Sequence, residues 1–348
     1  MNKFKMIDTN EILPKIKIIG VGGAGIHIIQ QIADLESPFQ YMIMDSNRSC
    51  LNEDLLGDGV LLGQSINESG LGAGANIELA RKFAMSSEQD IIAAIKGADM
   101  VFIIAGLGGG IGSGCVPVIA QIAQNLNVPS IAFMTEPFSF EGGLRNKNTQ
   151  MALQELDSIN TAIVLVSNMQ LIATTSANDR LVDAFLKSGK LLSNFVNKVL
   201  LICTSTGLIN IDFSDIKTII SQSGRLFIGE SSVNDGDISI EDTIKEASQN
   251  SLIMNNQFTL GQAIGVIAYI EIGPDFNLGQ LDLIGDEVQK IAADDAEVML
   301  GITIVPDWDD QLRMTIVSMN KKKQDIAGST ELLNFTKSNT KNFYGRIK

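Results

Sequence analysis

Short apolar runs alternate with amphipathic segments through the first half of the chain. Five runs have the length and composition of buried strands, at residues 16–21, 41–45, 100–105, 130–135 and 162–166. The segments between them carry apolar residues at helical spacing. This alternation predicts an α/β domain with a doubly wound parallel sheet.

The second half of the chain has a different pattern. A long helical stretch without proline covers residues 178–203. Beyond it lie strand-like runs at 263–272, 298–305 and 311–318 and helical segments at 239–249 and 285–293. Gly, Ser, Asn and Asp accumulate over residues 224–236, which indicates a change of domain there. We therefore expect a smaller α+β domain after the long helix.

Length and composition favour a folded protein with two domains. The chain has 348 residues, of which 45% are hydrophobic. No apolar run approaches the roughly 18 residues of a membrane-spanning helix, and the first residues lead into polar sequence rather than a signal-peptide core. We expect a cytoplasmic protein without an integral membrane segment. Cys50, Cys115 and Cys203 are isolated, which argues against a disulfide framework and a zinc site.

The formal charge of −14 is unevenly distributed. Residues 319–348 hold seven Lys or Arg against Asp325 and Glu331, so the rest of the chain is more acidic than the total. Such an acidic body repels phosphate groups over most of its surface, which argues against binding of nucleic acid. The basic tail is the segment best suited to an anionic partner, although solubility is the simpler explanation for its charge.

The densest glycine cluster lies between the apolar run 100–105 and a helical segment that begins near Cys115. Six glycines occur within residues 106–114. Residues without a Cβ let backbone amides converge on an anion, and a helix N-terminus adds its partial positive charge. The cluster is predicted to hold phosphate without the lysine of a P-loop. Its candidate contacts are Gly108, Gly109, Gly110, Ile111, Gly112 and Ser113.

A second glycine loop occupies the first strand-to-helix turn, where residues 20–25 satisfy the GxGxxG pattern and Asp45 ends the next strand. Taken alone, this combination is typical of NAD-dependent oxidoreductases, which stay an alternative on these residues. A dinucleotide has one pyrophosphate and needs only one such loop. Two loops suit the phosphate chain of a nucleoside triphosphate held from both sides. The candidate contacts here are Gly22, Gly23, Ala24, Gly25 and Asp45.

A third segment of small residues, 70–76, opens the helix that begins near Glu78. Ala73, Gly74 and Ala75 could let amides approach a terminal phosphate. A plain glycine-rich loop with Asn76 as helix N-cap explains the same residues.

Together with two further motifs, these loops follow the order found in FtsZ, a family of the tubulin superfamily. The chain resembles that family over about residues 15–318. The matching motifs are residues 16–23, 70–76, 108–114, 137–142 and 207–215. The resemblance implies a GTPase with GTP or GDP and Mg²⁺ as cofactors. It further implies head-to-tail polymerisation into cytoskeletal filaments that form a septum or ring at the cell-division site.

The resemblance also implies a division of the chain. We expect an N-terminal extension, a nucleotide-binding domain, a central helix with a catalytic acidic loop, a C-terminal α+β domain and a short basic tail. Their expected bounds are 1–15, 16–177, 178–223, 224–318 and 319–348.

In the family, the loop after the long helix enters the nucleotide pocket of the next subunit. Asn210, Asp212 and Asp215 match the residues of this loop. The resemblance implies that the two acids polarise the attacking water and help to place Mg²⁺. From the residues alone, a helix cap and a solvated turn explain the same pattern.

Other matches concern the ribose and the base. Glu141 and Arg145 match positions that contact the ribose and the nucleotide in the family, and Phe185 matches a residue that stacks near the base. Asn168 belongs to the same predicted pocket. A surface acid and an exposed salt bridge are the alternatives for Glu141 and Arg145 without the resemblance.

Several residues depart from the family pattern. Ile111 stands where Thr is usual, His27 replaces an Asn associated with base recognition, and Gly189 replaces the Asp or Asn that reads the guanine edge. Asp45 and Asn47 exchange the acid and the amide of the family's Asn-Thr-Asp. We expect a purine nucleotide, with GTP favoured, bound with altered affinity or reduced discrimination. The alternative is a paralogue that hydrolyses slowly and assembles alone or with a standard FtsZ.

The tail is a further departure, because it holds no recognisable copy of the family's terminal docking peptide. Residues 332–335 and 343–346 offer apolar anchors among cations. Membrane-anchoring division proteins are therefore candidate partners through the tail, besides other copies of the chain itself.

Overall fold

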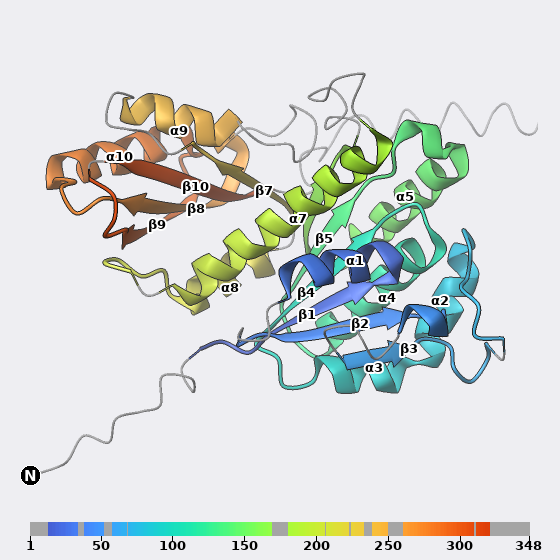
Figure 1. The fold of residues 1–348 in the computed structure, drawn as a ribbon. Helices are drawn as coiled ribbons and strands as arrows, with labels where there is room; N and C mark the ends of the chain where they lie inside the picture. Colours follow the sequence, from blue (N-terminus) through green and yellow to red (C-terminus); the bar gives the residue numbers. More distant parts are fainter. Residues whose placement is uncertain are drawn as a thin grey trace, which may run out of the picture.

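The computed structural model describes residues 13–33, 38–51, 58–67, 69–168, 180–205, 207–222, 224–232, 239–249, 260–309 and 311–320. Within these residues, one sheet runs through the molecule in the strand order β3-β2-β1-β4-β5-β6-β7-β10-β8-β9 (Figure 1). No helix in this part of the chain is long and apolar enough to span a membrane.

The strands β1 to β6 form the parallel part of the sheet. Their bounds are β1 Ile16–Val21, β2 Gln40–Asp45, β3 Asp58–Leu61, β4 Met100–Gly106, β5 Ser130–Thr135 and β6 Ala162–Val166. Neighbouring strands are parallel throughout, which confirms the predicted doubly wound sheet. The short edge strand β3 was missed because Asp58 and Gly59 have low strand propensity.

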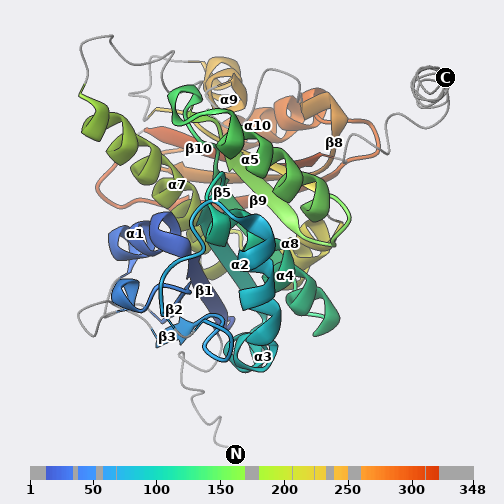
Figure 2. The same ribbon diagram turned by 90° about the vertical axis from the view of Figure 1, so that its right-hand side faces the viewer.

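Helices cover both faces of this sheet, as Figure 2 shows. One face carries α1 Gly22–Ile32 and α7 Leu181–Thr204, and the other carries α2 Ile77–Ser86, α3 Glu88–Ile95, α4 Gly110–Asn125 and α5 Gly143–Leu156. A hydrophobic core lies on each face of the sheet, and successive strand residues point into opposite cores. Phe102 packs in the core under α1 and α7, and Ile103 packs in the core under α2 to α5. This alternation follows from the period of two in a strand.

The chain then builds the second half of the sheet. Its elements are α8 Phe213–Ser221, β7 Gly224–Glu230, α9 Ile240–Gln249, β8 Ala263–Ile272, α10 Leu278–Ile291, β9 Glu297–Ile304 and β10 Leu312–Asn320. The strands β8, β9 and β10 form a third hydrophobic cluster with α9 and α10. The predicted strands and the helix at 239–249 are present, while α8 was not predicted.

Two differences from the sequence patterns have local causes. Residues 224–230 form the strand β7, although their composition indicates a change of domain. This strand is parallel to β6 and antiparallel to β10. The helix α10 begins at Leu278 rather than at residue 285. Asn277 caps it, since its Oδ1 accepts a hydrogen bond from the Gln280 N–H at 3.1 Å, while its own N–H donates to Gln280 Oε1.

Candidate nucleotide site

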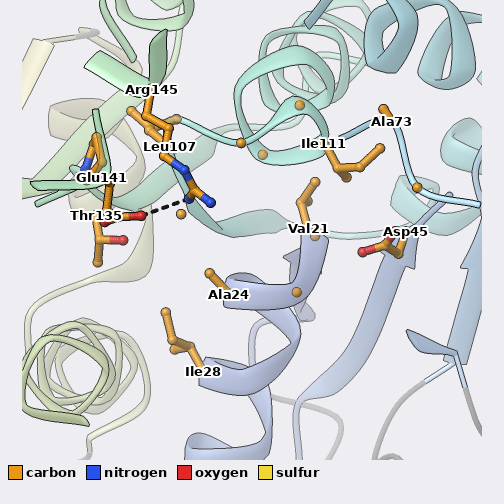
Figure 3. A pocket seen from close by; sticks show the side chains of 18 of the residues that line it. Val21, Ala24, Ile28, Asp45, Ala73, Leu107, Ile111, Thr135, Glu141 and Arg145 are labelled. Carbon is orange, nitrogen blue, oxygen red and sulfur yellow. Dashed lines mark ion pairs between the residues drawn. The ribbon is translucent and has the colours of Figure 1, made fainter. Parts of the chain in front are cut away.

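A cavity of about 400 Å³ opens at the carboxyl ends of the parallel strands. Its wall includes the loops after β1, β2, β4 and β5 and one face of α7. Figure 3 shows Val21, Ala24, Asp45 and Ile111 around the same space. Ligand sites of α/β sheets occupy this edge, and the volume falls in the range of small-molecule pockets.

The first glycine loop joins β1 directly to α1. Gly22, Gly23 and Ala24 line the cavity. Gly22 has φ of +72°, which favours glycine, and no side chain caps the helix. The first-turn amides of α1 therefore face the cavity without helical acceptors. Gly25 does not line the cavity. A Cβ there would lie 2.2 Å from the Ile104 carbonyl oxygen, so this glycine permits close packing of α1 on β4.

The second loop joins β4 to α4. Gly109, Gly110, Ile111 and Gly112 line the cavity at the start of the helix. The Oγ of buried Ser113 accepts a hydrogen bond from the Gly108 N–H at 2.8 Å, and neither of these two residues lines the cavity. They hold the loop in shape. The N-termini of α1 and α4 consequently provide two partial positive charges at one end of the cavity.

The third loop braces the second. Ala73 and Gly74 line the cavity, and the Gly74 carbonyl accepts a hydrogen bond from the Gly110 N–H at 2.8 Å. Ala75 lies outside the lining, and its carbonyl accepts from Asn148 Nδ2 at 2.9 Å. The same Nδ2 donates to the Gly108 carbonyl at 3.0 Å. The second and third loops thus form one hydrogen-bonded part of the rim.

The ribose and base candidates lie toward α7. Glu141, Arg145, Asn168, Phe185 and Gly189 all line the cavity. Arg145 Nη1 lies 2.8 Å from Glu141 Oε2, the ion pair drawn in Figure 3. The other Glu141 oxygen accepts the Phe138 N–H at 2.8 Å. These contacts fix Glu141, while the arginine stays half-exposed at the mouth of the cavity.

His27 is the base candidate that the fold does not bring to the cavity. It is exposed on α1, and its Nε2 lies 3.1 Å from Gln31 Nε2. Ile28 lines the cavity instead. Successive helical residues point about 100° apart, so a one-residue difference decides which side chain faces the ligand.

The charges of the cavity are mostly negative. Burial raises the pKa of Asp45, whose Oδ1 accepts the Asn47 N–H at 2.8 Å. Burial also raises the pKa of Glu136. Among the residues lining the cavity, Arg145 is the one cationic side chain, and it is paired with Glu141. Attraction for an anion therefore comes from backbone amides and helix termini rather than from side-chain cations.

The lining also contains residues that are not among the candidate contacts, although Gly72, Gly106, Leu107 and Pro137 fall inside the predicted motifs. The additional residues are Val21, Ile28, Asn47, Cys50, Gly72, Gly106, Leu107, Thr135, Glu136, Pro137 and Ser188. Thr135 ends β5, and Glu136 and Pro137 follow it directly, so the position at the end of a parallel strand was a usable signal for these three. The side chains from α1 and α7 depend on how the two helices are oriented, which the sequence pattern did not resolve.

The acidic loop lies elsewhere. Asn210, Asp212 and Asp215 lie between α7 and α8 or in the first turn of α8, and none of them lines the cavity. Asp212 caps α8 through a 3.0 Å hydrogen bond from the Ser214 N–H, which lowers the pKa of this exposed carboxyl. The Oδ1 of Asn210 accepts the Gly207 N–H at 2.5 Å. Within the described ranges, no group of three or more His, Cys, Asp or Glu is placed to hold a metal ion.

Comparison with known proteins gives matches to two family models. Residues 15–176 match the GTPase domain of the Tubulin/FtsZ family. Residues 225–320 match the C-terminal domain of the FtsZ family.

Curated relatives cover most of the chain. The cell division protein FtsZ of Wigglesworthia glossinidia brevipalpis is 32% identical over 315 residues, which are 89% of this chain and 81% of that protein. The cell division protein FtsZ of Haemophilus influenzae is 31% identical, with 89% and 78% of the two chains covered.

Solved structures agree with this relationship. The FtsZ dimer of M. jannaschii has a TM-score of 0.77 and 27% identity over 91% of this chain and 95% of that one. CetZ2 from Haloferax volcanii shares the fold, with a TM-score of 0.74 and 20% identity over 94% and 98% of the two chains. With both domain models matched in order and relatives above 30% identity, this chain belongs to the tubulin/FtsZ family.

Proposed function

We propose that this chain is a GTPase of cell division that assembles head to tail, with each nucleotide hydrolysed at the junction of two subunits. It binds guanine nucleotide in the cavity at the carboxyl ends of the strands and forms filaments. The observation that carries the proposal is the separation of the cavity from the acidic loop along α7. Its curated relatives are named as cell division proteins, and one solved relative is described as a dimer.

The helix α7 keeps the two half-sites apart. Phe185 and Gly189 lie in its first half and line the cavity, whereas the loop with Asp212 follows its last residue, Thr204. From Gly189 to Thr204 the helix rises about 22 Å at 1.5 Å per residue. An acid on this loop cannot reach the nucleotide of its own subunit. It can reach the nucleotide of a neighbour stacked in the same orientation, which is a heterologous and open-ended contact.

Exposed apolar side chains occur both near the cavity and near the acidic loop. Leu71, Phe140 and Leu144 are 67%, 57% and 60% exposed, and each lies next to a residue that lines the cavity, namely Gly72, Glu141 and Arg145. Beside the acidic loop, Leu208 is 64% and Ile209 is 47% exposed. Large exposed apolar side chains gathered at opposite ends favour contact with another copy of the chain.

The phosphate end is built for a nucleotide with a cation. The first-turn amides of α1 and α4 would hold phosphate oxygens, with Arg145 at the mouth. Asp45 and Glu136 add negative charge to the cavity, and Arg145 is already paired with Glu141. Phosphates bound here therefore need a cation such as Mg²⁺ to balance their charge. When bound, Mg²⁺ offsets charge on the phosphates during transfer.

Hydrolysis would be completed by the neighbouring subunit. Its Asp212 and Asp215 carry the negative charge needed to orient a water and accept its proton, and Asn210 adds an amide beside them. The hydrogen bond from Ser214 keeps Asp212 ionised over a wide pH range. Ile111 offers no hydroxyl at the phosphate loop, and we expect it to slow turnover relative to a threonine at this position.

The competing functions have less support. A NAD-dependent oxidoreductase is not favoured, since the matched models and relatives are of the FtsZ family. A paralogue that hydrolyses GTP slowly and co-assembles with a standard FtsZ is not favoured either. The rate of GTP turnover distinguishes it from the proposed function. Docking of membrane-anchoring division proteins concerns the tail, which lies outside the described residues except for Met319 and Asn320. Action in the cytoplasm at the division site is part of the same proposal.

Mixing two inactive variants tests the subunit junction. Asp212→Ala removes the acid and leaves the cavity intact. Gly109→Asp places a carboxylate at the N-cap of α4, where a Cβ meets nothing within 4 Å, so this subunit folds but repels phosphate. Each variant alone should release little phosphate from GTP. The mixture should recover turnover, because a Gly109→Asp subunit supplies its acidic loop to the nucleotide of an Asp212→Ala subunit.

The same measurement has a control and a contrary result. Wild-type turnover per subunit should rise with protein concentration and coincide with light scattering. Turnover that is independent of concentration, together with a mixture that stays as inactive as its parts, would contradict hydrolysis at a subunit junction.

A further inference from the structure

The acidic loop pairs with β9, a strand from a distant part of the sequence. The Ile209 N–H donates to the Ile302 carbonyl oxygen at 3.2 Å, and the Ile302 N–H donates to the Ile209 carbonyl oxygen at 2.9 Å. The two residues thus form an antiparallel bridge. Within the described residues, β9 is the last strand of the sheet and pairs with β8 on its other side. The loop therefore covers part of an edge that no other described strand covers.

Two glycines allow this close approach. A Cβ on Gly207 would lie 2.1 Å from the Ile302 carbonyl oxygen, so a side chain there would push the loop away from β9. A Cβ on Gly301 would lie 2.7 Å from Ile211 Cδ1 and 2.9 Å from Ile211 Cγ1. Ile211 directly precedes Asp212 and packs against a hydrophobic cluster. The bare backbone of Gly301 therefore sets how close the residue before the acid lies to the sheet.

The loop buries little of its own surface. Within residues 207–212, Gly207 and Ile211 are partly buried and the other residues are exposed. Both partly buried residues lie against β9. A segment with so little buried surface opens easily unless hydrogen bonds and close contacts hold it. Besides the two helices that flank the loop, the contact with β9 therefore holds it in one conformation.

Hydrogen bonds within the loop carry this placement to the acids. Asn210 Oδ1 accepts the Gly207 N–H at 2.5 Å, which closes the turn. The Asp212 carbonyl oxygen accepts the Asp215 N–H at 3.0 Å, in addition to the cap made by its side chain. Asp212 is thus both the end of the loop and the start of α8. A displacement of Ile211 from β9 would therefore move both acids.

We propose that β9 positions the acidic loop for hydrolysis, with Gly301 as the positioning residue that acts through Ile211. This inference rests on the proposed function and names residues that aim its acids at the neighbour's nucleotide. A displacement of about 1 Å can slow a reaction about a hundredfold. The part of the sheet that holds β9 thus takes part in hydrolysis, although none of its described residues lines the cavity.

The test compares Gly301→Ala with Gly285→Ala. Gly285 lies on α10, and a Cβ there would lie 3.7 Å from Leu300 Cδ1, an ordinary contact on the opposite face of β9. GDP affinity is measured by calorimetry and GTP turnover by phosphate release. Gly301→Ala should keep the wild-type affinity for GDP and lose at least about tenfold in turnover. Gly285→Ala should keep both.

A change of Ile211 tests the route from Gly301 to the acids. Ile211→Ala removes the Cγ1 and Cδ1 atoms that the new methyl group of Gly301→Ala would meet. Because it loosens the same contact, Ile211→Ala alone should lower turnover and keep GDP affinity, which also tests the placement if Gly301→Ala folds poorly. In the Ile211→Ala background, Gly301→Ala should lower turnover by no more than about twofold further. Full turnover of Ile211→Ala, or an equal loss from Gly301→Ala in both backgrounds, overturns the inference.

Mixtures of variants separate a displaced loop from a general folding defect. Gly301→Ala should recover turnover when mixed with Gly109→Asp, whose acidic loop is intact, and should not recover it with Asp212→Ala. Wild-type turnover of Gly301→Ala alone, or failure of both mixtures, overturns the positioning role. The proposed function still stands in that case if Asp212→Ala mixed with Gly109→Asp recovers turnover. If this reference mixture stays inactive, the proposed function fails and the inference fails with it.

Discussion

The side chain of Ile111 packs against the backbone of Gly22. A Cβ placed on Gly22 would lie 3.4 Å from Ile111 Cγ2 and 3.4 Å from the Gly112 nitrogen. Ile111 is only 8% exposed and belongs to the same hydrophobic cluster as Val21 and Ala73. Its side chain thus lies in a hydrophobic cluster with residues from the other two glycine-rich loops, in addition to lining the cavity.

Ile111→Thr should make the protein less stable and its phosphate site stronger. The change replaces the buried ethyl branch of isoleucine by a hydroxyl, which we expect to cost about 1–2 kcal/mol in urea denaturation of nucleotide-free protein. The hydroxyl can donate to a phosphate oxygen, so GTP affinity and turnover should increase. Ile111→Val is the matched control. It should cost about 1 kcal/mol and bring no gain in affinity.

Substitution by alanine should have opposite effects on stability at Gly112 and at Gly23. A Cβ at Gly112 would lie 2.1 Å from the Gly106 carbonyl oxygen, so Gly112→Ala forces the backbone apart, at a cost on the order of 3 kcal/mol or loss of folding. At Gly23 a Cβ meets nothing within 4 Å, and alanine favours the helix by up to about 1 kcal/mol. Gly23→Ala should fold well yet bind GDP more weakly, because its methyl group enters the cavity. Thermal unfolding and GDP titration of both variants check this contrast.

The free energy of unfolding of the nucleotide-free protein should change with pH because of the protonation of Asp45. Burial raises the pKa of Asp45, so its contribution to stability is complete below the ordinary pKa of an aspartate and is lost as pH rises through the raised pKa. Asp45→Asn stays neutral and keeps an oxygen for the Asn47 N–H. It should increase the urea midpoint at pH 7, with the difference shrinking in acid. Asp282→Asn, an exposed change on α10, is the control and should show little difference at either pH.

Two substitutions of Asp212 should separate its structural role from its catalytic one. Asp212 caps α8 through the Ser214 N–H, and asparagine caps a helix equally well. Asp212→Asn should therefore retain the thermal midpoint and GTP binding while GTP turnover falls strongly. Asp212→Ala should lose turnover and some thermal stability. If Asp212→Asn keeps full turnover in a phosphate-release assay, the carboxylate has no part in hydrolysis.

The sequence patterns predicted the parts of the fold that depend on local composition. Apolar runs located β1, β5, β6 and β8 at their observed bounds, because each is buried on both faces and bounded by polar residues. The edge strand β3 depends on pairing with β2, and the helix α8 begins at an aspartate cap that was read as part of a loop. The pairing of β3 is a contact distant in sequence, which composition does not reveal, whereas the α8 cap is a local contact between Asp212 and Ser214.

In the candidate site too, local sequence features were predictable and features that depend on packing were not. Glycine loops were recognisable because close approach of backbone leaves few alternatives to glycine, and most of their residues line the cavity. His27 and Ile28 differ by one helical position, and only the orientation of α1 determines which of them faces the ligand. The contact between Gln31 and the space beside Gly189 was invisible in sequence, since it depends on how two helices pack.

The ladder between β6 and β7 joins the two halves of the sheet through only two residue pairs, Ala162 with Gly224 and Ile163 with Arg225. Its neighbours are longer, with five pairs between β5 and β6 and six between β7 and β10. A pulling force along a filament would therefore load α7 and this short seam before any other part of the sheet. We expect tension between the two halves to separate this two-pair ladder before the longer ladders on either side of it.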